Sequence, residues 1–240
     1  MSARQKDILR QINYPESDGQ PMGETDKHIQ LMIDLRMALQ TFFRTAERVY
    51  VGSNLMCYYV EGDTSQSISP DVFVVLGAEK GERRVYKFWE EPVPNVVLEI
   101  SSRKTRKDDF GKKKDIYAWL GVREYFVFDP DARLRAPLRA FRWRGEELVE
   151  EMVTGQRVLS HELGLELVET GDTLRLADPR TGEFLLTPAE SYVRAAVEAN
   201  ARQAAEAARE QAQAARQEAE QRADRLAAKL RALGLDPDQP

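Results

Sequence analysis

The chain has 240 residues, of which 42% are hydrophobic and 31% charged, so it can bury a core and is not wholly disordered. Its 35 Lys and Arg against 40 Asp and Glu give a net charge of −5, which excludes nucleic-acid binding by bulk positive charge. A single cysteine excludes an intramolecular disulfide, and two histidines are too few for a metal site built from histidines. The chain also lacks a long apolar run, which predicts a cytoplasmic protein without a membrane partner.

The segment up to residue 130 predicts an α/β fold with a mixed central sheet. Residues 1–23 form a polar N-terminal arm that ends in turn-forming residues, and Thr25 is placed to cap a helix over 26–46. A second helix over 105–120 ends at Gly121. Apolar runs bounded by turn formers predict strands at 49–51, 55–60, 72–76, 96–100 and 125–128. The order helix, strands, helix, strand indicates helices flanking one mixed sheet.

The C-terminal half changes character twice. Short strands, among them 138–143 and 147–153, predict a β extension on the same sheet, which completes a domain over 24–186. Thr187 caps an alanine-rich helix over 187–233, where 17 of the 44 residues from 189 to 232 are alanine, and a tail covers 234–240. An apolar stripe makes this helix a candidate coiled coil, although an alanine seam buries little area.

Two carboxylates lie at the ends of predicted central strands. Asp71 opens the strand at 72–76, and Glu99 closes the strand at 96–100. If these strands are neighbours, the two carboxylates meet at one edge of the sheet, where oxygen ligands suit Mg²⁺. The simpler alternative is that both are strand-end acids that solubilise the edge.

A basic cluster follows Glu99 directly. Residues 101–114 contain seven basic and two acidic residues, and they include Arg103, Lys104, Arg106 and Lys107. Metal-binding acids beside a basic rim are what phosphodiester hydrolysis requires, because the basic side chains bind phosphates and offset negative charge. The alternative is a solvated helix face.

Helical spacing adds a lysine to this group. Asp109, Lys113 and Tyr117 stand at i, i+4 and i+8, so they share one helix face. A local Asp–Lys pair explains the first two. If the face is turned to the sheet edge, Lys113 instead orients or deprotonates an attacking water.

These residues resemble the Uma-two family of restriction endonucleases, within the PD-(D/E)xK nuclease superfamily. The resemblance covers most of residues 14–130 and rests on motifs such as Ser69-Pro70-Asp71-Val72, Val97-Leu98-Glu99-Ile100 and Gly111-Lys112-Lys113. It implies a restriction-endonuclease-like core that cuts DNA with a divalent metal, Mg²⁺ or Mn²⁺. Asp71 and Glu99 then take the places of the two metal-binding acids, assisted by the Ile100 carbonyl.

The sequence departs from the superfamily pattern in one place. Ser101 stands two residues after Glu99, where the common pattern has lysine. The resemblance places the lysine on the following helix at Lys113, with Lys112 as the neighbouring alternative. Glu24 is a candidate third acid, although stabilisation of the helix dipole explains it more simply. His28 is expected to be a partly exposed helix residue.

Two functions follow from these observations. The leading hypothesis is a metal-dependent DNA endonuclease with catalytic Asp71, Glu99 and Lys113. The competing hypothesis is an inactive nucleic-acid-binding or interaction protein of the same fold that works through its C-terminal helix. We also expect a homodimer formed mainly by the catalytic domain, because two subunits supply the two active sites that duplex cleavage needs.

Overall fold

The computed structural model describes residues 12–19, 24–131 and 136–232, so most of the predicted arm and the tail at 234–240 lie outside the described residues. The helices are α2 (Asp26–Phe42), α3 (Arg106–Phe110), α4 (Lys112–Leu120) and α5 (Pro188–Ala232). The strands are β1 (Val49–Gly52), β2 (Cys57–Tyr58), β3 (Ser67–Ile68), β4 (Val72–Leu76), β5 (Tyr86–Lys87), β6 (Val96–Ile100), β7 (Glu124–Phe128), β8 (Leu138–Arg144), β9 (Glu147–Glu151), β10 (Arg157–Ser160), β11 (Leu165–Thr170) and β12 (Thr173–Ala177).

A mixed six-stranded sheet forms the centre of the fold, which confirms the predicted α/β class. Its strand order is β1-β4-β6-β7-β8-β9. Within this sheet only the β6–β7 pair is parallel, and α3 and α4 make the crossover that a parallel pair requires. The β4, β6 and β7 strands are almost fully buried, as their uninterrupted apolar sequences predict.

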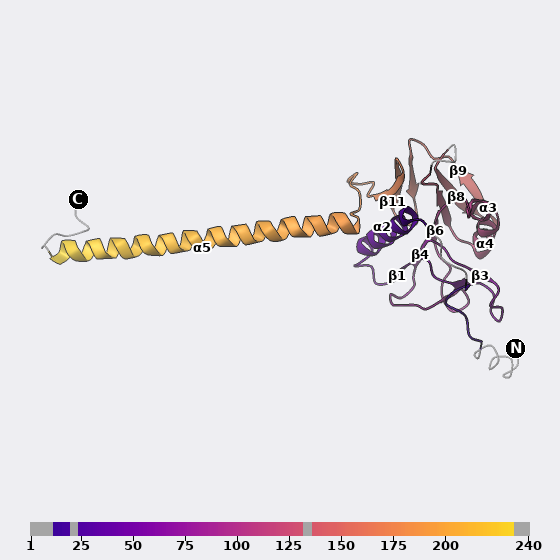
Figure 1. The fold of residues 1–240 in the computed structure, drawn as a ribbon, viewed down its shortest axis with the longest axis horizontal. Helices are drawn as coiled ribbons and strands as arrows, with labels where there is room; N and C mark the ends of the chain where they lie inside the picture. Colours follow the sequence, from indigo (N-terminus) through magenta and orange to yellow (C-terminus); the bar gives the residue numbers. More distant parts are fainter. Residues whose placement is uncertain (1–11, 20–23, 132–135, 233–240) are drawn as a thin grey trace. The chain divides into compact units, whose positions relative to one another are not determined.

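Alternating residues of the central strands face two different cores. Val72, Val74 and Leu98 pack in a core that includes α2 and the β10–β12 sheet. Phe73 and Val97 pack on the other side, in a core that includes α4. Figure 1 shows α2 and α4 on opposite sides of β6. The two helices therefore cover the two faces of the sheet, and both can supply side chains to its edge.

The predicted β extension divides into two parts. The β8 and β9 strands join the central sheet, whereas β10, β11 and β12 form a separate antiparallel sheet. Leu165, Leu167 and Leu176 of this second sheet lie in the same core as α2. A short third sheet has the order β3-β2-β5 and contains the buried Cys57.

Both predicted helices of the first half end or break earlier than their sequences indicate. The first ends at Phe42, and Lys80 Nζ donates to the carbonyls of Phe43 and Arg44 beyond it. The second is broken at Gly111, where ψ is −104° and an added Cβ would lie 2.9 Å from the Lys107 carbonyl oxygen. Glycine fits this close approach of two backbone segments, and the break separates α3 from α4.

The chain divides into two compact units, residues 1–188 and 189–240. In the second unit, α5 is 45 residues long and none of its residues is buried. Apolar side chains recur along it at successive steps of four, four and three residues, so the pattern repeats every eleven residues. The positions are Val193, Val197, Ala201, Ala204, Ala208, Ala212, Ala215, Ala219, Ala223, Leu226 and Leu230. A repeat of eleven keeps the stripe on one face of a nearly straight helix. Among the described residues, no helix combines the length and apolarity needed to span a membrane.

Candidate active site

The register of β4 and β6 brings Asp71 to Glu99. The strands are antiparallel, with Val72 opposite Leu98, so Asp71 lies opposite Glu99 when the register is continued by one residue. Directly opposed residues direct their side chains to the same face of a sheet. The Ile100 backbone N–H donates to Asp71 Oδ2 at 2.7 Å and fixes this carboxylate at the edge.

Glu99 is a fully buried carboxylate. Its Oε2 accepts a hydrogen bond from Lys113 Nζ at 2.8 Å, and its Oε1 accepts one from the Tyr117 hydroxyl at 2.6 Å. Burial, together with the nearby Asp71 and Asp109 charges, raises the pKa of Glu99 to about 8, and Lys113 opposes the shift. The side chain therefore gains strongly from any additional positive charge at the site.

The predicted helix face does lie against this edge of the sheet, although the helix is broken. Lys113 Nζ lies 3.2 Å from Asp109 Oδ1, and the Thr105 hydroxyl donates to Asp109 Oδ2 at 2.8 Å. Burial lowers the pKa of Lys113, but the surrounding carboxylates raise it more, so the lysine remains charged. Asp109 and Glu99 together fix the position of the ammonium group.

The structure adds a residue that the sequence analysis did not place in the site. His28 is buried rather than partly exposed, with its Nε2 3.1 Å from Asp71 Oδ1 and its Nδ1 3.3 Å from Glu24 Oε2. Burial lowers its pKa, but the hydrogen bond and charge of Asp71 raise it more. Burial would likewise raise the pKa of Asp71, and His28 and Lys113 reverse that shift. Glu24 thus enters the site through His28, beyond any effect on the helix dipole.

The remaining predicted residues divide into two groups. Lys104 and Thr105 line a cleft of about 870 Å³ beside Asp71, His28 and Lys113. The other five basic residues of the cluster lie outside this lining. Arg103, Lys107 and Lys112 are exposed, Lys114 is half-buried, and Arg106 is paired with Asp129 at 3.4 Å. Ser101 is buried, and its backbone N–H donates to the Phe128 carbonyl, so it continues the sheet. Burial raises the pKa of the neighbouring Asp109, and Lys113 and the Thr105 hydroxyl oppose that shift.

The charges of the site are unbalanced. Four carboxylates, from Glu24, Asp71, Glu99 and Asp109, face Lys113 and His28. Within the described ranges, no group of three or more His, Cys, Asp or Glu side chains is arranged to hold a metal ion. Asp71, which lines the cleft, and the buried Glu99 opposite it nevertheless fit Mg²⁺ or Mn²⁺, because Mg²⁺ binds through one or two carboxylates and takes water and phosphate oxygens as its other ligands.

Comparison with known proteins assigns the chain to a family. A family model named Uma2 and described as "Putative restriction endonuclease" matches residues 9–176. The chain belongs to the Uma2 family. The matched range includes every residue of the acidic site, and the family supports a nuclease-like function.

Two further comparisons add little to the Uma2 assignment. A crystal structure described as "a putative nuclease belonging to DUF820 from Anabaena variabilis" matches at a TM-score of 0.45 and 14% sequence identity. The match covers 65% of this chain and 89% of that one. No curated protein matches the chain significantly.

Proposed function

We propose that this Uma2 protein is a metal-dependent DNA endonuclease that hydrolyses phosphodiester bonds at the Asp71–Glu99 edge of the sheet. The observation that carries the proposal is the contact of Lys113 Nζ with the fully buried Glu99 carboxylate, next to Asp71 on the adjacent strand. Two metal-binding acids and a lysine are the groups that hydrolysis of a phosphodiester needs.

Asp71 and Glu99 are the residues that would hold the cation, with the Ile100 carbonyl as a third ligand. A bound divalent cation supplies Lewis-acid polarisation of the phosphate and lowers the pKa of water. His28 positions Asp71 through the hydrogen bond to Oδ1, and Tyr117 positions Glu99 through the hydrogen bond to Oε1. These contacts keep both carboxylates directed along the edge of the sheet.

Lys113 has two tasks in this proposal. Its ammonium Nζ orients the attacking water by hydrogen bonding, and its charge offsets the negative charge that develops on the phosphate. Asp109 limits the movement of Nζ, since it binds the same ammonium group from the helix side. Lys104 in the cleft, together with Arg103 and Lys107 on the exposed rim, binds phosphates of the DNA backbone.

The proposal is tested with supercoiled plasmid DNA and the full chain. We expect nicked and linear products with Mn²⁺ or Mg²⁺, and no products with EDTA. Single-stranded and branched DNA should be assayed in parallel to define the substrate. The proposal is wrong if purified protein gives no metal-dependent product from any of these substrates.

One observation favours the second candidate function, an inactive nucleic-acid-binding or interaction protein. Ser101 occupies the strand position where the superfamily has lysine, and it is buried in the sheet. Calorimetric titration separates the candidates, because the nuclease predicts Mg²⁺ or Mn²⁺ binding that is lost in Asp71→Asn. An Asn variant that binds metal like the parent chain would favour the inactive protein.

We also propose that the protein is a homodimer formed by its first unit. The α5 stripe is mostly alanine, and a buried methyl contributes only about 0.8 kcal/mol, so this helix should add little to assembly. A chain that stops after Thr187 should therefore sediment like the full chain in analytical ultracentrifugation. A monomeric truncated chain beside a dimeric full chain would instead assign assembly to α5.

A further inference from the structure

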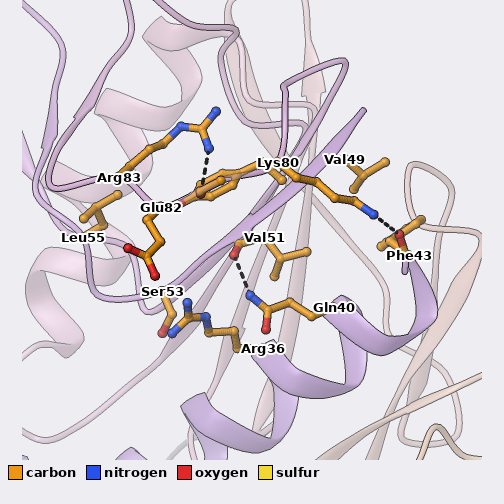
Figure 2. A pocket seen from close by; sticks show the side chains of 12 residues that line it. Arg36, Gln40, Phe43, Val49, Val51, Ser53, Leu55, Lys80, Glu82 and Arg83 are labelled. Carbon is orange, nitrogen blue, oxygen red and sulfur yellow. Dashed lines mark hydrogen bonds between the residues drawn. The ribbon is translucent and has the colours of Figure 1, made fainter. Parts of the chain in front are cut away.

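A second cavity of about 690 Å³ lies next to the catalytic cleft. Figure 2 shows Arg36 and Gln40 extending from α2 into this cavity, with Val51 of β1 behind them and Lys80, Glu82 and Arg83 on the other side. The Gln40 amide donates to the Val51 carbonyl at 3.4 Å. The nuclease chemistry proposed above uses none of these residues.

The two cavities follow one another along the length of α2. Glu24, His28 and Met32 line the catalytic cleft, and Arg36 and Gln40 line the second cavity, so the lining residues recur at every fourth position. The rise of an α-helix puts Arg36 about 12 Å beyond His28, which is the span of about two to four nucleotides.

A short segment separates the cavities. Ser53 and Leu55 face the second cavity, whereas Asn54 and Met56 face the catalytic cleft. The Asn54 backbone has φ +48°, and its N–H donates to the Pro70 carbonyl at 2.9 Å, next to Asp71. The segment 53–56 therefore lines both cavities, and the hydrogen bond to Pro70 connects it to the start of β4.

The second cavity combines a planar polar group with apolar surface. The Arg83 guanidinium lies 3.9 Å from the centroid of the Tyr50 ring, and Arg83 Nε donates to both Glu91 oxygens at 2.7 and 2.8 Å. Val51 and Leu55 add apolar side chains beside this pair. Aromatic rings and guanidinium planes are surfaces on which unpaired bases stack.

The charge of the second cavity is opposite to that of the catalytic site. Three basic residues and one acidic residue, Glu82, line it, in a chain whose net charge is −5. Glu91 neutralises Arg83, and Lys80 donates to carbonyls at the end of α2. The exposed Arg36 is therefore the cation of this cavity that is placed to bind a phosphate.

We propose that the second cavity binds an unpaired nucleotide of the cut DNA strand, with Arg36 on its phosphate and the outer face of the Arg83 guanidinium, whose inner face covers the Tyr50 ring, against its base. A base within a duplex is stacked on both faces and paired at its edge, so it cannot enter a cavity unless it leaves the helix. The protein should therefore prefer DNA that is unpaired a few nucleotides from the scissile phosphate. This inference rests on the proposed nuclease function for the identity of the strand.

Binding, rather than cleavage, tests the inference. Fluorescence anisotropy compares a labelled single-stranded oligonucleotide with the blunt duplex of the same sequence, using the Glu99→Gln chain in EDTA to prevent cleavage. Arg36→Gln should weaken single-strand binding about fivefold and lower the salt slope by about 0.7, the value for one phosphate contact. Glu82→Gln should strengthen it, because it removes the one acidic residue of the lining.

Arg44→Gln is the matched control, because Arg44 is exposed near the end of α2 and lines neither cavity. Arg44→Gln should leave the affinity for the single-stranded oligonucleotide unchanged. Arg36→Gln should leave the affinity for the duplex unchanged. The inference is overturned if Arg36→Gln and Arg44→Gln have equal effects, or if single-strand and duplex binding weaken together. Absence of metal-dependent cleavage of plasmid, single-stranded and branched DNA would reject the nuclease function, whereas Arg36-dependent binding of single strands would still support the nucleotide site.

Discussion

Glu99→Gln is expected to reduce metal-dependent cleavage about 10³-fold or more while leaving the fold intact. Glutamine has the shape of glutamate and keeps a carbonyl oxygen to accept a hydrogen bond, but it lacks the charge that holds a divalent cation. The measurement is the rate of plasmid nicking at saturating Mn²⁺, with circular dichroism to verify the fold. A variant that nicks plasmid at the parent rate would remove Glu99 from the active site.

The same substitution should change how stability depends on pH. Burial raises the pKa of Glu99 to about 8 in the folded state, from a value near 4.5 in the unfolded state. Between pH 4.5 and about 8, the folded chain therefore holds one proton more than the unfolded chain. Stability of the metal-free parent chain therefore falls as pH rises through this window, and Glu99→Gln removes that contribution. Melting temperatures in EDTA between pH 5 and about 9 test this sign. Glu147→Gln, at an exposed position of β9, should retain the slope of the parent chain.

Much of this site can be predicted from local sequence. Uninterrupted apolar runs identify β4 and β6 as central strands, and the positions of Asp71 and Glu99 follow from the strand ends. Spacing also predicts that Asp109, Lys113 and Tyr117 share one helix face. In the structure Lys113 and Tyr117 contact Glu99, and Asp109 contacts Lys113. The break at Gly111 does not spoil this arrangement, because α4 still presents Lys113 and Tyr117 one turn apart.

Other features depend on contacts between distant segments. His28 is buried because α2 meets Asp71, 43 residues further along the chain, and the only local signal is its i, i+4 spacing from Glu24. The separation of β10–β12 from the central sheet likewise depends on which strands pair, and alternating apolar residues do not specify the partner. The second cavity combines residues from α2, β1 and the 80–83 segment, so no single stretch of sequence indicates it.

Lys113→Met is expected to lower cleavage about 10²- to 10⁴-fold and to destabilise the metal-free protein. The substitution leaves Glu99 buried beside Asp71 and Asp109 without their shared ammonium. Above the Glu99 pKa of about 8, where this carboxylate is charged, loss of one partner from the buried ion pair costs about 3 kcal/mol, which corresponds to a fall in melting temperature of roughly 6–12 °C. Lys112→Met is the control, because Lys112 is the exposed neighbour and should change neither quantity.

Added metal distinguishes a catalytic Lys113 site from an ion pair that is only structural. Asp71 and Glu99 repel each other, and in Lys113→Met a divalent cation becomes the main positive charge available to them. Mg²⁺ or Mn²⁺ should therefore raise the melting temperature of Lys113→Met more than that of the parent chain, although cleavage is not restored. If neither chain is stabilised by metal, the acids do not form a metal site. If the loss of cleavage appears in Lys112→Met instead, the catalytic lysine is Lys112, and the contact between Lys113 and Glu99 serves folding alone.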